Sequence, residues 1–450
     1  MVGAPEKFPM KSVDILYFVE HVARELDIAC AVKAIIERDT ELRVEIVSIT
    51  HRIEETLTNF QPRVVTLPYC VAVHEAGLDK IVARWPQAEY VSLSYEQVLG
   101  QAQKDLNSPK DEFAQKFVLY HAWGDFFAEY LKTHAVPPEH IYINGNPSYA
   151  LYRPPYADYY DNQREALAKQ FGLDAGKRWV FIPENYGWAF FEDHMVRARI
   201  RRGFDPQQAY EYRDFARASL RAVSIWWREA AKIDELEIII RPRPAIPAQN
   251  FIERVRECAG DLPNRLHFIK HGTVREWILA ADVVVSSYST TMLEGAVARK
   301  PVYMLAPQPF PALLHADWYA LTDQLETQTD FLAAISQKEL TKNWVELEKW
   351  LIPLMMSRGD AIANIARMLT VKAKGELSTP PPLEIARQLE RVTAERLYRT
   401  ARKHGWRLFQ NTLAALGIQT QDQGWTAHES DAINPAEIAR RVKRWREILV

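Results

Sequence analysis

The first 150 residues alternate between short apolar runs and segments whose apolar residues recur with a helical period. The apolar runs predict strands over residues 13–19, 43–49, 63–68 and 90–93. Between them, the pattern predicts a helix over 24–38 and a shorter helical segment near Glu54. Strands that alternate with helices of this length form βαβ units, which indicates a parallel sheet.

A second set of the same kind follows later in the chain. Its predicted strands cover residues 178–183, 236–240, 266–269 and 283–285, with a further apolar run from Pro301. Its helices are predicted over 206–232, around 276–279 and from Thr290. Between the two sets, aromatic residues at helical spacing predict one helix over 113–134, and a strand from Ile141 ends in a turn. We therefore expect an α/β protein with two Rossmann-like, doubly wound domains.

The expected domain boundaries follow from breaks in these patterns. The first domain is expected over residues 1–155, which end in the linker-like Tyr152-Arg-Pro-Pro155, and the second over 156–325. Residues 326–374 are expected to form helices, over 344–356 and 360–369, that pack back across the cleft between the domains. Residues 375–450 are expected to form a helical extension.

The extension begins with a proline-rich break at 377–382, followed by a predicted helix over about 383–416. This helix is basic over 396–407, and Trp406, Leu408 and Phe409 are interleaved with the charges. An amphipathic helix of this kind is compatible with the inner face of a membrane, with a sister subunit in a homodimer, or with the protein's own surface. The pattern leaves all three open.

Composition narrows the function classes. The formal net charge is -2 over 450 residues, which gives no general reason to expect nucleic-acid binding. The three cysteines have no metal-like spacing, and the sequence offers no Asp-x-Asp pair for a divalent ion, so neither a metal nor another cofactor is expected. The N-terminus lacks a signal-peptide pattern, and no apolar run is long enough to span a membrane. We expect a cytoplasmic protein.

Hydroxyl side chains follow the strand predicted over 283–285. Ser286, Ser287, Ser289 and Thr290 lie between this strand and the next helix. Hydroxyl groups and free backbone N–H groups at a helix start favour an anion, which indicates a phosphate site. The alternative is that Ser289 and Thr290 only cap the helix.

Arginines follow the strand predicted over 236–240, in the sequence Arg241-Pro-Arg-Pro244. Each proline disfavours a helical conformation for the residue before it, so Arg241 and Arg243 are expected to be extended at the carboxyl end of the strand. Two guanidinium groups there suit bidentate contacts with a phosphate. Glu184, which follows the strand over 178–183, is expected at the same edge and is included in the predicted nucleotide site.

The loop after the third predicted strand carries the first domain's candidate acid–base residues, His74 and Glu75. Ligands of open α/β sheets bind beyond the carboxyl ends of the strands, where this loop is expected. Glu75 is predicted to be the catalytic base, and His74 either orients its carboxylate or is itself the base. The alternative is that both are ordinary polar loop residues.

Five short motifs, taken in order, resemble those of the bacterial surface-carbohydrate biosynthesis proteins. They are Ser94-Tyr-Glu-Gln97, Trp123-Gly124, Ile143-Asn-Gly-Asn-Pro147, Arg241-Pro-Arg-Pro244 and Ser286-Ser287. The chain is similar in these motifs to the capsule Kdo transferases and bacterial sialyltransferases, over about residues 10–310. The resemblance implies a GT-B fold, in which two domains face across a cleft, and donors that are CMP-activated 2-keto sugar acids.

The sequence departs from that family at two positions. The relatives carry a His-Pro pair where this chain has Arg243-Pro244; arginine can bind a phosphate but cannot donate a proton. The relatives also carry an acidic pair before a glycine, where this chain has His74-Glu75-Ala76-Gly77. The second departure puts in doubt whether this loop is still catalytic.

The leading hypothesis is a metal-independent glycosyltransferase. It would move a sugar such as Kdo or a nonulosonic acid from a CMP-activated donor to a cell-surface glycan or glycolipid. Two alternative enzymes share the architecture: a UDP-sugar 2-epimerase, for which the acidic residues are not found, and a CDP-glycerol glycerophosphotransferase. A non-catalytic scaffold that binds a nucleotide sugar is a fourth hypothesis.

Overall fold

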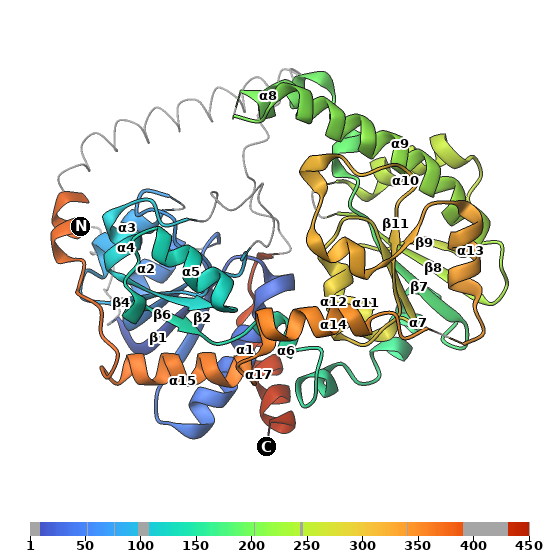
Figure 1. The fold of residues 1–450 in the computed structure, drawn as a ribbon. Helices are drawn as coiled ribbons and strands as arrows, with labels where there is room; N and C mark the ends of the chain where they lie inside the picture. The colour runs from blue at the N-terminus through green and yellow to red at the C-terminus, as the bar shows by residue number, and fades with distance from the viewer. Residues whose placement is uncertain are drawn as a thin grey trace, which may run out of the picture. The chain divides into compact units, whose positions relative to one another are not determined.

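The structure, a computed structural model, describes residues 10–51, 53–75, 77–97, 108–201, 203–243, 246–339, 341–389 and 431–449 (Figure 1). The chain divides into two compact units. The first comprises Met1–Pro147 and Arg358–Val450, and the second comprises Ser148–Ser357. Each unit contains its own parallel sheet and is described by itself below.

The first unit is built on a six-stranded sheet in the order β2-β1-β3-β4-β5-β6, in which all pairs are parallel. The strands are β1 (Lys11–Val19), β2 (Val44–Ser48), β3 (Phe60–Leu67), β4 (Glu89–Ser92), β5 (Val118–Ala122) and β6 (Ile141–Ile143). The helices between them are α1 (Val22–Asp39), α2 (Ile53–Asn59), α3 (Leu78–Arg84), α4 (Glu112–Lys116) and α5 (Asp125–Thr133). Helices α15 (Ala361–Ala373) and α17 (Pro435–Ile448) return to the same unit.

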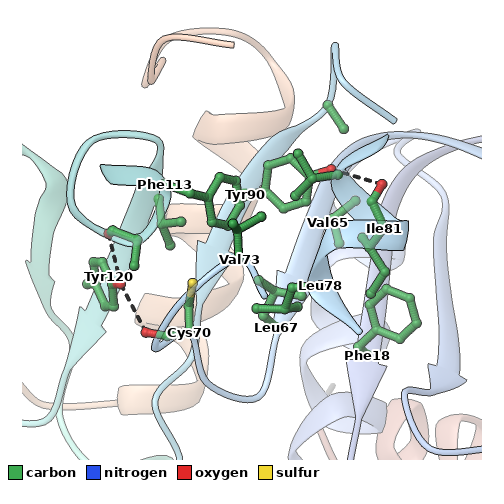
Figure 2. Close-up of a cluster of buried hydrophobic side chains, with 14 of the residues drawn as sticks. Phe18, Val65, Leu67, Cys70, Val73, Leu78, Ile81, Tyr90, Phe113 and Tyr120 are labelled. Carbon is green, nitrogen blue, oxygen red and sulfur yellow. Dashed lines mark hydrogen bonds between the residues drawn. The ribbon is translucent and has the colours of Figure 1, made fainter. Parts of the chain in front are cut away.

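One face of this sheet packs against α3, α4 and α5 in a core of buried apolar side chains (Figure 2). Tyr120 on β5 extends from the sheet into this core, where its hydroxyl donates to the carbonyls of Ala114 (2.9 Å) and Cys70 (3.2 Å). These bonds satisfy the buried hydroxyl and fix the loop after β3 against the sheet. The loop that carries His74 and Glu75 is thereby anchored at its start.

The single helix predicted over 113–134 is wrong. The structure has α4, then strand β5, then α5 in that range. The aromatic residues happened to match a helical spacing, but all five residues of Val118–Ala122 are buried because β5 is an interior strand covered on both faces. Such a strand has no alternating pattern, so periodicity alone cannot separate it from a helix.

The second unit contains a six-stranded parallel sheet in the order β12-β11-β10-β7-β8-β9. The strands are β7 (Arg178–Pro183), β8 (Leu236–Arg241), β9 (Leu266–Phe268), β10 (Val283–Ser286), β11 (Val302–Leu305) and β12 (Asp323–Leu325). Helices α9 (Pro206–Ala230), α10 (Ala248–Ala259) and α13 (Gln328–Ser336) cover one face, and Figure 1 shows α9 as the long helix of this layer. Helices α7 (Gln163–Phe171), α11 (Val274–Ala280) and α12 (Thr291–Val297) belong to the same unit, as do α8 (Asp193–Ile200) and α14 (Val345–Leu351).

Helix α12 lies close to strands β10 and β11 because Gly295 has no side chain. A Cβ atom built at Gly295 would lie 2.8 Å from Val302 Cγ1 and 3.3 Å from Val284 Cβ. We expect Gly295→Ala to lower the free energy of unfolding by about 1–3 kcal/mol, because overpacking a buried contact outweighs the better helix propensity of alanine. Chemical denaturation measures this difference, and an unchanged or higher stability would contradict the close packing of α12.

The C-terminal extension contains two described helical segments, and residues 376–382 before the first one are not helical. Residues 383–389 are helical, and α17 packs along α1 with Val442 and Trp445 buried. The basic stretch 396–407 and Trp406, Leu408 and Phe409 lie outside the described residues, so the predictions that rest on them stay predictions. Among the described residues, no helix combines the length and apolarity that a membrane crossing requires.

Candidate functional site

The second sheet has a topological switch point between β7 and β10. Strands β7, β8 and β9 follow one another outward, and the chain then returns so that β10 lies on the other side of β7. Loops that leave adjacent strands in opposite directions form the crevice in which open α/β sheets bind ligands. Every nucleotide-site residue predicted from the sequence lies at the carboxyl end of β7, β8 or β10 or in the loop that follows one of these strands.

Ser286 and Ser287 are at this edge, but their side chains connect strands. Both residues are 1% exposed. Ser286 Oγ donates to the Pro183 carbonyl at 2.6 Å, and Ser287 Oγ donates to the Leu305 carbonyl at 3.1 Å. The two hydroxyls therefore join the end of β10 to β7 on one side and to β11 on the other. In this structure both hydroxyls donate their protons to backbone carbonyls of the protein.

The next two hydroxyl residues lie at the start of α12. Ser289 Oγ accepts from the Thr291 hydroxyl at 2.8 Å and from the Thr291 backbone N–H at 3.3 Å. Thr290 is exposed and occupies the N-cap position without a side-chain capping bond. Of the two residues in the capping alternative, Ser289 therefore binds the first turn of α12, whereas the Thr290 side chain makes no capping bond.

Two residues that the sequence analysis did not select close the switch point. The Asn185 side chain donates to the Tyr288 carbonyl at 3.1 Å, and the Tyr288 hydroxyl donates to the Asn185 carbonyl at 2.5 Å. This reciprocal pair ties the loop after β7 to the loop after β10. The Tyr288 ring also packs edge-on against Tyr186 and Tyr212, and burial raises the pKa of Tyr288. Asn185 closely follows β7 and Tyr288 closely follows β10, so their positions after predicted strands could have selected both residues from the sequence.

Glu184 is buried beneath this loop and is 6% exposed. Its Oε1 accepts from the backbone N–H of Arg243 at 2.7 Å, and its Oε2 accepts from the backbone N–H of Tyr186, also at 2.7 Å. Burial raises the pKa of Glu184, and the two hydrogen bonds oppose that rise. The carboxylate therefore connects the loop after β8 to the loop after β7.

Arg241 is directed at its own protein. Its Nη1 donates to the His271 carbonyl at 2.8 Å, and its Nη2 donates to the Gly272 carbonyl at 2.6 Å. Burial lowers the pKa of Arg241 to about 10. In this structure Arg241 holds the loop between β9 and α11.

Arg243, two residues further along, is exposed, and its guanidinium has no hydrogen-bonding or ion-pair acceptor among the residues that the structure describes. The side chain lies over Gly187, where a built Cβ would be 3.6 Å from Arg243 Cδ and 3.7 Å from Nη1. Lys270, after β9, is near the same edge; its Nζ donates to the Ile246 carbonyl at 2.7 Å, and burial lowers its pKa. At the carboxyl edge of the second sheet, the Arg243 guanidinium is therefore available to bind an anion.

In the first unit, His74 and Glu75 are in the loop after β3, as predicted. The switch point of this sheet lies between β1 and β3, because β2 is on one side of β1 and β3 is on the other. Both side chains are exposed. The Glu75 carbonyl accepts from the Leu78 N–H at 3.0 Å, and Gly77 has a φ of 78°, which forms the tight turn into α3.

The loop after β1 and the first turn of α1 contain charged residues that the sequence analysis missed. Arg24 Nη2 lies 2.7 Å from Glu25 and 3.4 Å from Glu20, and Arg24 Nη1 pairs with Glu96. Burial raises the pKa of both Glu20 and Glu25, and burial and Glu20 raise the pKa of Tyr69. Glu20 directly follows the predicted strand over 13–19, so the rule that selected His74 and Glu75 could have selected it as well.

The first-unit motifs of the family resemblance meet at one edge of the sheet. Gln97 Nε2 donates to the His121 carbonyl at 3.1 Å, and Gln97 Oε1 accepts from the Trp123 N–H at 2.8 Å. The Asn144 amide lies 3.2 Å from His121 Nδ1, and burial lowers the pKa of His121 to about 3. These residues join the ends of β4, β5 and β6.

Comparisons with known proteins identify the fold. No protein-family model matches the chain, and no curated protein sequence matches it. Among solved structures, the chain is similar to the wall teichoic acid polymerase TagF, with a TM-score of 0.51 and 9% identity over 81% of this chain and 90% of that chain. A second TagF structure gives a TM-score of 0.50 and 10% identity over 82% and 90%. UDP-GlcNAc 2-epimerase from Neisseria meningitidis gives 0.46 and 11% identity over 80% and 100%.

At these identities the similarity shows the fold alone. The predicted fold class is confirmed: the two doubly wound, Rossmann-like units match the GT-B architecture of the wall teichoic acid polymerase TagF. The epimerase match is too distant to support an argument. The closer resemblance to Kdo transferases and sialyltransferases stays a prediction.

Proposed function

We propose that this chain is a GT-B glycosyltransferase that moves a 2-keto sugar acid, such as Kdo or a nonulosonic acid, from a CMP-activated donor to a cell-surface glycan or glycolipid. The observation that carries the proposal is the guanidinium of Arg243, which is exposed next to the β7–β10 switch point and has no acceptor among the described residues. A phosphate group is the bidentate acceptor that such a guanidinium prefers.

The proposed reaction requires a base and a stabilised leaving group. The acceptor hydroxyl oxygen forms a bond to the anomeric carbon, and the bond from that carbon to the CMP phosphate oxygen breaks. The hydroxyl proton passes to a base, for which Glu75, assisted or replaced by His74, is the proposed group. The negative charge that develops on the phosphate is stabilised by Arg243.

A second candidate is transfer of glycerol phosphate from CDP-glycerol. The fold shared with a wall teichoic acid polymerase favours it. In that reaction the acceptor oxygen attacks a phosphorus atom and CMP again leaves, so the same arginine would serve. UDP-sugar epimerisation and a non-catalytic scaffold remain alternatives on sequence grounds alone.

Thermal unfolding in the presence of CMP, UDP, CDP and GDP tests the nucleotide part of the proposal. A ligand that binds only the native state raises the melting temperature by mass action. A shift that is largest with CMP supports either cytidine-based reaction, and product analysis with a CMP-sugar or CDP-glycerol separates the two. A shift with UDP alone would favour the epimerase, and no shift with any nucleotide would reject the proposed site.

Arg243→Ala is expected to weaken CMP binding by about 1.5–3 kcal/mol, because it removes a hydrogen-bonding partner that is charged. Isothermal titration measures the loss directly. Equal CMP affinity in Arg243→Ala and the native chain, with folding intact, would remove Arg243 from the site.

Arg241→Ala is the matched control. The sequence predicts that Arg241 also contacts the phosphate, whereas its terminal nitrogens bind the His271 and Gly272 carbonyls in the structure. Loss of those bonds should lower the stability of the β9–α11 loop, so Arg241→Ala should reduce the free energy of unfolding more than Arg243→Ala does. A loss of CMP affinity without a loss of stability would instead support a direct role for Arg241.

A further inference from the structure

Glu184 was predicted to contact the nucleotide, but both of its carboxylate oxygens bind the protein. The residue directly follows β7, next to the switch point. Its oxygens accept the backbone N–H groups of Arg243 and Tyr186, each at 2.7 Å. A side chain that is 6% exposed and doubly bonded offers a nucleotide little direct contact.

These two hydrogen bonds fix both the backbone of Arg243 and the loop on which its side chain lies. The first fixes the Arg243 backbone at the point where the chain leaves β8. The second fixes Tyr186, and the next residue, Gly187, is the surface over which the Arg243 side chain lies. The Glu184 carboxylate therefore positions both the Arg243 backbone and the loop that supports the Arg243 side chain.

The same bonds keep the guanidinium available. A carboxylate close to an arginine ordinarily forms an ion pair with it, and the pair would then compete with a phosphate. Here the oxygens of Glu184 are occupied by backbone N–H groups, and no ion pair between Glu184 and Arg243 is formed in the described structure. The buried negative charge still favours the positive charge of Arg243 and Lys270 nearby.

We propose that Glu184 is a positioning residue of the donor site: it presents the Arg243 guanidinium to the phosphate of the bound nucleotide by bridging the loops after β7 and β8. The inference rests on the proposed function and specifies how that site is organised. It replaces the predicted direct contact between Glu184 and the nucleotide.

The test is a double-mutant cycle on CMP affinity, measured by isothermal titration on the full chain. Glu184→Gln keeps the side-chain length but can accept only one of the two N–H groups. We expect it to weaken CMP binding about tenfold. If Glu184 acts through Arg243, the variant that carries both Glu184→Gln and Arg243→Ala should bind CMP no more weakly than Arg243→Ala alone.

Glu237→Gln is the control for the loss of a buried carboxylate. Glu237 is 4% exposed and lies in the same sheet, but near the amino end of β8, where it accepts from the Asp174 N–H at 3.2 Å and pairs with His267 at 2.7 Å. It should lower stability without changing CMP affinity. If Glu184→Gln does not fold, the same cycle is carried out with Glu184→Asp.

The outcomes separate the inference from the proposed function. CMP binding by the native chain that depends on Arg243, together with additive losses in the cycle, would overturn the positioning role alone. Equal losses of affinity in Glu184→Gln and Glu237→Gln would also overturn it, because a general loss of stability would then explain both. Failure of the native chain to bind CMP would reject the proposed function and this inference together.

Discussion

Glu75→Gln is expected to lower sugar transfer by about 100- to 10,000-fold while leaving CMP affinity unchanged. A general base typically contributes this factor, and glutamine cannot take up the acceptor's proton. Nucleotide affinity should be preserved because the proposed phosphate contacts belong to the second unit, whereas Glu75 is in the first. The measurement is CMP released from a CMP-activated 2-keto sugar acid in the presence of glycan acceptors, alongside CMP titration.

Glu112→Gln provides a matched control, since Glu112 is an exposed glutamate of the same unit that pairs only with Lys116 on its own helix in the described structure. Full turnover in Glu75→Gln together with a loss in His74→Ala would identify His74 as the base. Full turnover in both variants would show that this loop is not catalytic. A scaffold, or a base elsewhere in the first unit, would then be the better account.

The sequence predicted most strands because interior parallel strands are continuous apolar runs. Residues 178–183 are the clearest example, since the prediction and β7 coincide. The two strands that were missed fail for opposite reasons. β5 is apolar, but the aromatic residues on either side of it, such as Phe117 and Trp123, have a helical spacing. β12 is a short edge strand with two exposed polar residues, Asp323 and Gln324, that give no apolar signal.

The sequence also predicted that the candidate donor residues lie at the carboxyl edge of the second sheet, where the structure has them, since that position follows from the local strands and the general rule for open sheets. It could not give the direction of each hydroxyl. Ser286 binds a carbonyl 103 residues earlier, and Ser287 binds one 18 residues later. Those acceptors are adjacent only because β10 returns to lie between β7 and β11, which is a property of the strand order.

The difference in hydrogen bonding between Arg241 and Arg243 also depends on how distant segments of the chain are arranged. Arg241 and Arg243 have similar neighbours in sequence, and each precedes a proline. The structure separates them because the β9–α11 loop, about 30 residues away, provides carbonyls for Arg241 and none for Arg243 among the described residues. No local pattern contains that information.

Arg441→Ala is expected to lower the free energy of unfolding by about 3–5 kcal/mol. Arg441 on α17 pairs with Asp27 on α1, 414 residues earlier, and the Asp27 side chain is 3% exposed. Removal of the arginine takes a cation away from a buried carboxylate, and the free energy lost is far larger than for an ion pair in water. Denaturant titration followed by circular dichroism measures the difference.

Arg446→Ala is the control on the same helix. Its partner Glu37 is also on α1, at 2.8 Å, but the Arg446 side chain is 50% exposed, so the pair is expected to contribute about 0–1 kcal/mol. Equal, small losses in both variants would show that α17 is weakly bound to α1 and that the first unit folds without it. A large loss confined to Arg441→Ala would show that the last helix of the chain is an integral part of the unit that carries His74 and Glu75, because the free energy of a buried ion pair is lost only where the helix is docked.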